Sequence, residues 1–235
     1  MQASLDFSDS RLSNWRSKLT HRLGGLVDPP RRSPIGQLIK SAISSRTRDA
    51  VSLAAFHQLL IRCPTPRDIA EAAVSEVERE IGTVTYADVK ARHLVAALGM
   101  IANEQPDFDL SFLGTITVPD ALAWLERHPG VGRKVAAATL NASTLKRPVF
   151  IVDSHVHRVL IRLGTIGPKA SAKAASEFVT SSSGLDAEGL LELFAQMKLL
   201  GQTICRFEQA HCSLCPLATG CRTARKAMDA PRARS

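Results

Sequence analysis

The feature that most constrains the fold is the recurrence of apolar residues three and four positions apart along most of the chain. This spacing places apolar side chains on one face of an α-helix. It predicts helices over seven segments: 35–44, 49–61, 86–102, 133–144, 154–163, 170–181 and 186–201. Only residues 147–153 ("RPVFIVD") have the composition of a strand, and we interpret them as an extended connector because no second candidate strand could pair with them. The sequence therefore predicts an all-α protein.

Residues at the starts of these segments carry helix-capping signals. Pro66 and Pro119 each stand where the first turn of a helix is expected, with acidic residues after them. Ser75 with Glu78 has the spacing of a capping box. Asp153 directly precedes the segment 154–163, so it is the expected N-cap of that helix.

Length and charge limit the class of protein. A chain of 235 residues can form one large domain or two small ones, and we expect two lobes. The net charge of +8 favours a polyanionic partner, because clustered cations gain from the release of phosphate counterions. No run of 18 apolar residues and no apolar leader is present, so we expect a cytoplasmic protein without a membrane partner. Residues 27–34 are expected to form a linker, and the basic segment after Cys221 a mobile tail.

A turn between two helices is expected at "HPGVGRK", residues 128–134, within a helical hairpin at about 121–144. Its two glycines allow the backbone N–H groups of the turn to point outward together at a helix N-terminus. Such a group of N–H donors binds phosphate without a side-chain charge. The candidate DNA contacts of the hairpin are Gly130, Val131, Gly132 and Arg133. A plain tight connection between helices is the alternative interpretation.

Four of the five cysteines lie within seventeen residues near the end of the chain, as C-x6-C-x2-C-x5-C: Cys205, Cys212, Cys215 and Cys221. Four thiolates at these spacings can close a tetrahedral zinc site or hold a [4Fe-4S] cluster. Spacing alone leaves both possibilities open, with free thiols or disulfides as a third. Cys63 stands apart and is expected to be a small buried residue.

Two motifs together resemble a known family. "HPGVGRKVA" followed by "VDSHVHRV" is similar to the helix-hairpin-helix and aspartate loop of the endonuclease III family of DNA glycosylases, and the similarity extends over about 33–221. The resemblance implies a two-lobed fold: a six-helix lobe over 27–146, and a cluster-bearing lobe over 1–26 plus 147–235. It further implies an active site in the cleft between the lobes. The cysteine spacing matches the family's cluster loop, here 205–221, which implies a [4Fe-4S] cofactor rather than zinc. That loop is expected to present basic residues, Arg206 and Arg222 among them, towards phosphates.

By the same resemblance, Lys134 corresponds to the nucleophilic lysine of the family and Asp153 to its catalytic aspartate. The chemistry agrees, because an amine attacks a sugar carbon only when it is neutral, and a helix N-terminus disfavours the ammonium form. A nearby carboxylate can accept the proton of the amine or stabilise the cationic sugar. The alternatives are a solvated surface lysine and an ordinary helix cap.

One stretch departs from the family. Endonuclease III carries a glutamine in a segment that reads like S-A-Q-x-T-D, where the glutamine fills the gap left by the flipped nucleotide. Here Arg46 stands at that place. A guanidinium group pairs with the acceptor edge of guanine, so we expect Arg46 to favour guanine as the opposite base. Tyr86 is expected either to stack on DNA or to be a core aromatic, and His155 and His157 are expected to have structural roles.

The sequence therefore predicts a bifunctional DNA glycosylase and abasic-site lyase of base excision repair. It would remove a damaged or mismatched pyrimidine through a Lys134 Schiff base and nick the strand by β-elimination. Its expected partner is double-stranded DNA with a damaged or mismatched base or an abasic site, bound by a monomer. The alternatives are a mismatch adenine glycosylase, a monofunctional thymine-mismatch or alkyl-base glycosylase, and a non-catalytic helix-hairpin-helix module with a structural zinc.

Overall fold

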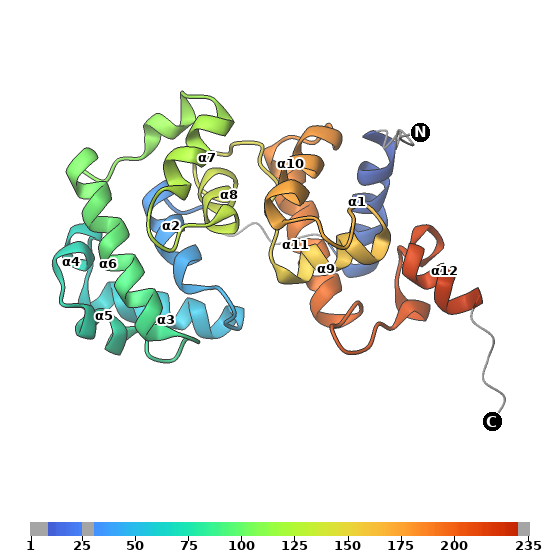
Figure 1. The fold of residues 1–235 in the computed structure, drawn as a ribbon, viewed down its shortest axis with the longest axis horizontal. Helices are drawn as coiled ribbons and strands as arrows, with labels where there is room; N and C mark the ends of the chain where they lie inside the picture. Colours follow the sequence, from blue (N-terminus) through green and yellow to red (C-terminus); the bar gives the residue numbers. More distant parts are fainter. Residues whose placement is uncertain (1–8, 25–30, 230–235) are drawn as a thin grey trace. The chain divides into compact units, whose positions relative to one another are not determined.

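The computed structural model describes residues 9–24 and 31–229, and this part of the chain is built from helices without a strand (Figure 1). The α-helices are α1 (Asp9–Leu23), α2 (Pro34–Ile43), α3 (Asp49–Arg62), α4 (Pro66–Glu71), α5 (Val74–Glu80), α6 (Ala87–Glu104), α7 (Val118–Glu126), α8 (Arg133–Asn141), α9 (Ser154–Leu163), α10 (Ala172–Ser182), α11 (Ala187–Thr203) and α12 (Arg222–Asp229). Three short 3-10 helices are η1 (Ser111–Gly114), η2 (Cys212–Leu214) and η3 (Ala218–Gly220). The all-α prediction is confirmed, and each of the seven predicted segments is helical. None of the described helices combines the length and the apolar character needed to cross a membrane.

The chain divides into two compact units. We call Pro30–Arg147 the hairpin unit, because it contains α7 and α8. Met1–Pro29 together with Pro148–Ser235 form the cysteine unit, which contains the four clustered cysteines. The sequence predicts lobes over 27–146 and over 1–26 plus 147–235 as functional domains. The two units are defined only by contacts within the fold, so the functional division stays a prediction.

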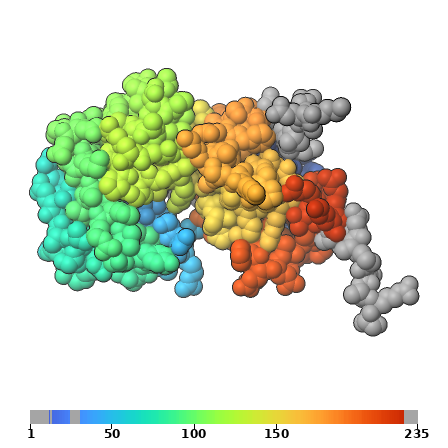
Figure 2. Space-filling model, in the orientation of Figure 1, coloured from blue at the N-terminus to red at the C-terminus, as the bar shows by residue number. Residues whose placement is uncertain are grey.

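The hairpin unit is organised around α6. This helix packs against α4 and α5 and also against α2, which in turn packs against α8. In the space-filling view, α4, α5 and α6 form a continuous surface of this unit (Figure 2). The largest fully buried side chains of this unit are apolar: Leu38, Ile39, Ile43, Leu59, Ile69, Ile81, Leu94, Leu98 and Ile101. Burial of each such side chain stabilises the fold by about 1.5–3 kcal/mol before entropy costs are counted.

The cysteine unit brings together segments that are far apart in the sequence. Helix α1 lies beside α11, and α9 packs against α10, α11 and α12 (Figure 1). Helix α1 was not among the predicted segments, although Leu12, Trp15 and Leu19 have the helical spacing and are buried in its core. These residues pack against α11, a helix some 170 positions later in the chain, so no neighbouring segment of the sequence indicates their partner.

Residues 147–153 form the extended connector that was predicted. The backbone N–H of Phe150 donates to Thr180 Oγ1 at 2.9 Å, and its carbonyl accepts from Ser176 Oγ at 2.6 Å. Side chains of α10 therefore satisfy the backbone groups that a neighbouring strand would otherwise pair. Residues 149–152 of the connector are buried, and the connector leads directly into α9.

The helix starts confirm most of the predicted caps. Pro66 and Pro119 lie in the first turns of α4 and α7. The capping box predicted at Ser75 is wrong, because α5 begins at Val74 and its N-cap is Ala73, without a side-chain hydrogen bond. Ser75 is thus already inside the first turn, where its side chain is past the capping position.

Two predictions about connecting segments need correction. Within the predicted linker 27–34, residues 31–34 are bound to the hairpin unit: Arg31 donates to the Asn141 carbonyl oxygen at 2.6 Å, and Ser33 caps α2. Residues 27–30 lie outside the described part of the chain. The mobile tail predicted after Cys221 is wrong over Arg222–Asp229, which is helix α12, because Ala224 is buried against the core of the cysteine unit. Residues 230–235 lie outside the described residues.

Candidate functional site

The predicted helical hairpin is formed by α7 and α8, joined by residues 127–132. Gly130 has φ +74°, the left-handed region that favours glycine. A Cβ atom at Gly130 would lie 2.8 Å from the Cβ atom of His93, which belongs to α6. Both the backbone conformation and the contact with α6 therefore require glycine at this position.

Two backbone N–H groups directly before α8, those of Gly130 and Gly132, are open. Gly132 is the N-cap and offers no side chain to its helix. The N–H groups of Gly130 and Gly132 donate no hydrogen bond within the described residues, whereas Val131 N–H closes the turn onto the His128 carbonyl oxygen at 3.1 Å. Open donors at the positive end of a helix dipole form a site that suits an anion.

Arg133 does not direct its guanidinium group outward with these donors. Its Nε and Nη2 atoms donate to the two carboxylate oxygens of Glu126, the last residue of α7, with 3.3 Å for the Nη2 bond. Its side chain is only 9% exposed. The guanidinium group thus joins the two helices of the hairpin, whereas the sequence predicted Arg133 as a contact with DNA.

Lys134 is the second residue of α8 and is half-buried. Its Nζ atom donates to the Ser41 carbonyl oxygen of α2 at 3.4 Å. The packing of α8 on α2 therefore directs the amine to a defined place.

Asp153 is the N-cap of α9, as predicted. Its Oδ1 atom accepts from the Val156 N–H at 2.8 Å. Its second oxygen, Oδ2, makes no hydrogen bond within the parts of the chain that the structure describes. One oxygen of the half-buried carboxylate thus caps the helix, and the other is available to a ligand.

The two histidines after Asp153 take part in structural contacts. The His157 Nε2 atom lies 2.8 Å from the Ala170 carbonyl oxygen, and His155 Nδ1 lies 3.3 Å from Nη2 of Arg158. Neither contact involves a nucleophile or a candidate base. These contacts are consistent with the structural roles expected for both residues.

Arg46 lies in the turn between α2 and α3, with φ 52°. Its guanidinium carbon lies 5.7 Å from the ring centroid of Tyr86, within cation–π range. Tyr86 is the N-cap of α6, has φ 60°, and is 55% exposed, so the interpretation of Tyr86 as a core aromatic is wrong. Two exposed side chains with large flat groups therefore meet on the hairpin unit.

A pocket of about 430 Å³ joins this pair to the hairpin turn. It is lined by Arg46 and Tyr86, by Lys90 and His93 of α6, and by the turn residues 129–131. The structure thus brings Arg46, Gly130 and Val131, all predicted DNA contacts, to one pocket. The sequence analysis did not single out Lys90 as a site residue. One signal was present: Lys90 lies four residues before the buried Leu94, which places it on the apolar face of α6.

Lys134 belongs to the hairpin unit and Asp153 to the cysteine unit. The geometry of each is fixed by neighbours within its own unit: α2 for the lysine, the first turn of α9 for the aspartate.

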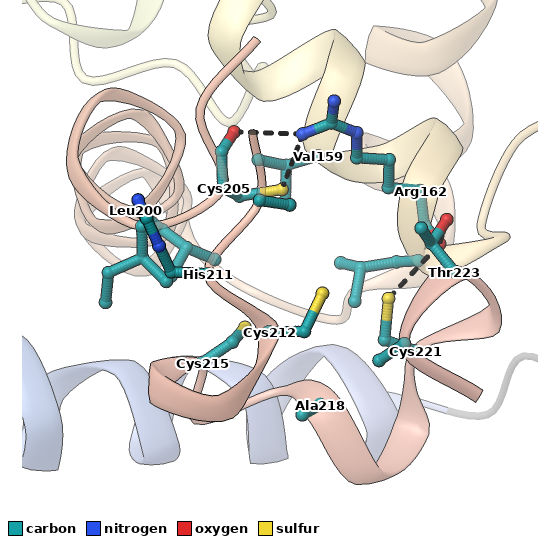
Figure 3. A pocket seen from close by; sticks show the side chains of 14 residues that line it. Val159, Arg162, Leu200, Cys205, His211, Cys212, Cys215, Ala218, Cys221 and Thr223 are labelled. Atoms are coloured by element: carbon teal, nitrogen blue, oxygen red, sulfur yellow. Dashed lines mark hydrogen bonds between the residues drawn. The ribbon is translucent and has the colours of Figure 1, made fainter. Parts of the chain in front are cut away.

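The four clustered cysteines line one small pocket of the cysteine unit, with a volume of about 20 Å³. Figure 3 shows the sulfur atoms of Cys205, Cys212 and Cys221 around the open centre of this pocket, with Cys215 beside Cys212. Arg162 of α9 donates to Cys205 Sγ at 3.4 Å, and Cys221 Sγ donates to the Arg162 carbonyl oxygen at 3.2 Å. A guanidinium group beside the sulfurs stabilises negative charge on them.

Four thiols are a donor set that both iron-sulfur clusters and zinc use. Within the described residues, no three Cys, His, Asp or Glu side chains come together closely enough to ligate one ion. Zinc takes all its sulfur ligands at about 2.3 Å from one centre, whereas a cluster distributes four thiolates over four irons. Burial raises the pKa of the Cys215 thiol to about 11, and burial with the neighbouring thiolates raises that of Cys212. Binding of a metal must therefore displace protons from these thiols.

Cys63 lies apart from this pocket and is buried, as predicted. Burial is also the largest cause that raises the pKa of its thiol. A protonated, buried thiol is a packing residue.

The hairpin, the open N–H groups at its turn and the half-buried lysine directly after it define the class of helix-hairpin-helix proteins. Residues 39–182 match the family described as HhH-GPD superfamily base excision DNA repair protein. The chain belongs to this superfamily of base excision DNA repair proteins. It is a DNA glycosylase of the endonuclease III type, as the resemblance predicted.

Individual proteins show the same relationship. Endonuclease III of Thermotoga maritima is 28% identical over 191 residues, which cover 80% of this chain and 82% of that protein. Adenine DNA glycosylase of Mycobacterium tuberculosis is 30% identical over 221 residues, covering 89% of this chain and 66% of that protein. The fold is shared with a trapped covalent intermediate of endonuclease III and DNA, described as an estranged-adenine complex. The TM-score is 0.76 at 22% identity, over 94% of this chain and 99% of that one.

Proposed function

We propose that this protein is a bifunctional DNA glycosylase and abasic-site lyase that removes a damaged or mismatched pyrimidine from double-stranded DNA. The observation that carries the proposal is the position of Lys134. It follows the open turn of the hairpin directly, at the second residue of α8, with its Nζ atom held by the Ser41 carbonyl oxygen at 3.4 Å. The helix N-terminus favours the neutral amine, which is the nucleophilic form.

In the proposed reaction, neutral Lys134 Nζ attacks C1′ of the deoxyribose. The N-glycosidic bond breaks, and the base leaves with the bonding electrons and takes up a proton. Loss of a proton from Nζ and opening of the sugar ring leave a Schiff base between Nζ and C1′. Removal of a C2′ proton then breaks the C3′–O bond and nicks the strand, and water hydrolyses the Schiff base to restore the lysine.

Asp153 is proposed as the carboxylate that accepts the proton from Nζ and stabilises the cationic sugar. Its Oδ2 atom, which makes no hydrogen bond within the described residues, supports this role. Its Oδ1 atom stays bound to the first turn of α9 at 2.8 Å, which fixes the orientation of the carboxylate. Such a group contributes about 10² to 10⁴ in rate.

DNA binding is proposed to begin at the hairpin turn. The open N–H groups of Gly130 and Gly132 and the net charge of +8 suit a phosphate backbone. Val131 would hold the turn, and Arg133 would contribute through its backbone, because its guanidinium group is bound to Glu126. A solved relative with this fold is a complex with DNA, which supports the same assignment.

Arg46 is proposed to enter the gap left by a flipped nucleotide and to read the opposite base. It is exposed, and it lies at the rim of the pocket that includes the hairpin turn. Its five N–H donors match the acceptor edge of guanine, which would favour lesions opposite guanine.

The cysteine pocket is proposed to hold a [4Fe-4S] cluster through Cys205, Cys212, Cys215 and Cys221. When bound, the cluster supplies a covalent crosslink between α11, η2 and the start of α12. Arg162 would offset the negative charge of the thiolates. The chain around these cysteines would then fold only with its metal, because ligand binding and folding are coupled.

Borohydride trapping on DNA with an abasic site tests the central step. We expect wild-type protein to form a covalent complex and Lys134→Ala to form none while still binding the DNA. The matched control is Lys173→Ala, because Lys173 is likewise the second residue of its helix, α10, but is exposed. Undiminished trapping in Lys134→Ala would place the nucleophile elsewhere.

A mismatch adenine glycosylase is the second candidate, favoured by the 30% identity to the adenine DNA glycosylase of Mycobacterium tuberculosis. Duplexes with an adenine–guanine mismatch, assayed beside the abasic-site duplexes, decide between the two. Excision of adenine opposite guanine, with no borohydride complex at any lesion, would support this candidate against the first.

A further inference from the structure

Lys90 is a buried cation with an unusual set of partners. It lies on α6 and is 8% exposed. Its Nζ atom donates to the Ile43 carbonyl oxygen at 2.8 Å, to the Ser45 carbonyl oxygen at 2.7 Å and to Thr47 Oγ1 at 3.1 Å. All three N–H donors of the ammonium group are therefore used on one turn, residues 43–47.

This turn is the one that carries Arg46. Thr47 Oγ1, besides accepting from Lys90, accepts from the backbone N–H of Thr85 at 3.1 Å. Thr85 directly precedes Tyr86, and Lys90 follows Tyr86 by one turn of α6. Hydrogen bonds thus join the turn to the start of α6 at two points, beneath Arg46 and Tyr86. We call these hydrogen bonds the crosslink.

The crosslink accompanies two unfavourable backbone conformations. Arg46 and Tyr86 both have positive φ, at 52° and 60°, which costs a residue with a side chain about 1 kcal/mol or more. Such conformations persist only where the surrounding contacts determine them. Here these contacts come from Lys90 and Thr47, and they leave the guanidinium group of Arg46 over the ring of Tyr86.

The burial of Lys90 is itself unfavourable. No carboxylate among the described residues pairs with it, and burial lowers the pKa of the Lys90 ammonium group to about 8. An apolar side chain of the same length would fill the space without this desolvation cost. The three hydrogen bonds to the turn are what an apolar side chain would lack.

We infer that Lys90 is a positioning residue: it holds the turn 43–47 so that Arg46 lies over Tyr86, and it affects DNA recognition only through Arg46. The effect on DNA rests on the proposed role of Arg46 in reading the opposite base. The effect on the turn is independent of that role.

The first experiment examines the turn without DNA. Tyr86 is the only tyrosine of the chain, so its ring resonances in an NMR spectrum are unambiguous. We expect Lys90→Met to shift these resonances in the same direction as Arg46→Ala, because both remove the guanidinium group from the ring. Arg92→Met is the control on the exposed side of the same helix and should leave them unchanged. Unchanged ring signals in a folded Lys90→Met protein, or an equal shift in Arg92→Met, would overturn the inference.

The second experiment measures affinity for duplexes with a non-cleavable abasic-site analogue opposite guanine. Lys90→Met should weaken binding about fivefold in the wild-type background and have no further effect in Arg46→Ala, since coupled residues are not additive. Equal weakening in both backgrounds would show that Lys90 acts by another route. Because no base is excised, this result stands even if the proposed glycosylase reaction fails.

Thr47→Val provides a second variant if Lys90→Met does not fold. It keeps the buried cation and its two carbonyl acceptors but removes the hydroxyl that receives both crosslinks. We expect a smaller Tyr86 shift in the same direction. A folded Thr47→Val protein with wild-type ring signals would contradict the crosslink.

Discussion

The starts of α8 and α9 lie some twenty residues apart and use the same physical feature in opposite ways. Gly132 begins α8 without a capping side chain, so the positive end of that helix is open to a ligand. Asp153 begins α9 and covers the positive end of its helix with its own carboxylate. A helix N-terminus favours negative charge in either case. At α9 the protein itself supplies the anion, whereas at α8 we propose that DNA supplies it. The two helix starts carry the two proposed catalytic groups, a carboxylate at Asp153 and an amine at Lys134.

The largest effect is expected where the cap and the proposed catalytic carboxylate are the same residue. Asp153→Asn keeps a competent N-cap but removes the charge. The free energy of unfolding should therefore fall by at most about 1 kcal/mol, whereas single-turnover base excision should fall by about 10² to 10⁴. Thermal denaturation and excision kinetics on the same preparation separate the two. Near-normal excision by Asp153→Asn would mean that Asp153 acts only as a helix cap and has no catalytic role.

The next effect concerns the turn that keeps α8 open. Gly130→Ala must adopt φ +74° and place its Cβ atom 2.8 Å from that of His93. We expect the free energy of unfolding to fall by about 2–3 kcal/mol, because a left-handed alanine and a displaced α6 contact add. Urea denaturation measures it. Gly167→Ala is the control, since no atom lies within 4 Å of a Cβ there; equal losses at both positions would mean that the turn is not specially constrained.

A direct exchange of the two kinds of helix start is possible at Gly132. Its backbone is extended, and a Cβ atom there would meet nothing within 4 Å. Gly132→Asp should cap α8 in the way that Asp153 caps α9 and stabilise the fold by a few tenths of a kcal/mol. It should also weaken DNA binding by about tenfold, because a carboxylate would occupy the place of a phosphate.

Gly132→Ser is the matched control for this exchange, since it adds a cap without a charge. Its affinity for DNA should lie between those of the wild type and Gly132→Asp in a binding titration at fixed salt. Unaltered binding in Gly132→Asp would argue that the open N–H groups are not the phosphate site.

The smallest effect is expected from pH, through the residue beneath the turn. His128 is 2% exposed, its Nε2 atom has no hydrogen-bond partner within the described residues, and burial lowers its pKa below 6.5. The unfolded chain therefore binds a proton more readily than the folded one. The stability from neutral His128 is present above about pH 6.5 and is lost as the pH falls through the lowered folded value, by at most about 1.4 kcal/mol per pH unit.

Melting temperatures at pH 7.5 and pH 5.5 check this sign. The wild type should lose more stability on acidification than His128→Leu, which keeps a side chain of similar size but cannot titrate. If both proteins lose the same amount, other groups account for the acid sensitivity of the hairpin unit.

The candidate site was predictable to the extent that its parts are local. The turn after α7 follows from its glycines, and the cap of α9 follows from an aspartate directly before an apolar helical stretch. The position of Lys134 in the first turn of α8 follows from the same turn. The cysteine spacing likewise located the metal ligands proposed here, although spacing alone did not choose between zinc and iron.

Other features could not be predicted because they depend on which segments pack together. The binding of the Arg133 guanidinium group by Glu126 across the hairpin is one of them, and the contact of Arg133 with DNA stays a prediction. Tyr86 had two open interpretations, and only the conformation of the α6 N-terminus decided for the exposed one. Nothing close to Lys90 in the sequence indicates that its partners are three oxygens on a turn more than forty residues earlier.

By itself, the sequence determined the all-α class, the seven main helices, the hairpin and the cap of α9, because apolar periodicity and turn chemistry act over a few residues. The tertiary structure alone decided which polar groups are turned inward and which stay open. Helix α1 finds its partner in α11, α12 is held by the core of the cysteine unit, and Lys90 fixes the turn that carries Arg46. The physical reason is that the burial and the hydrogen-bond partners of a residue depend on which distant segments pack together. A local sequence pattern does not contain that information.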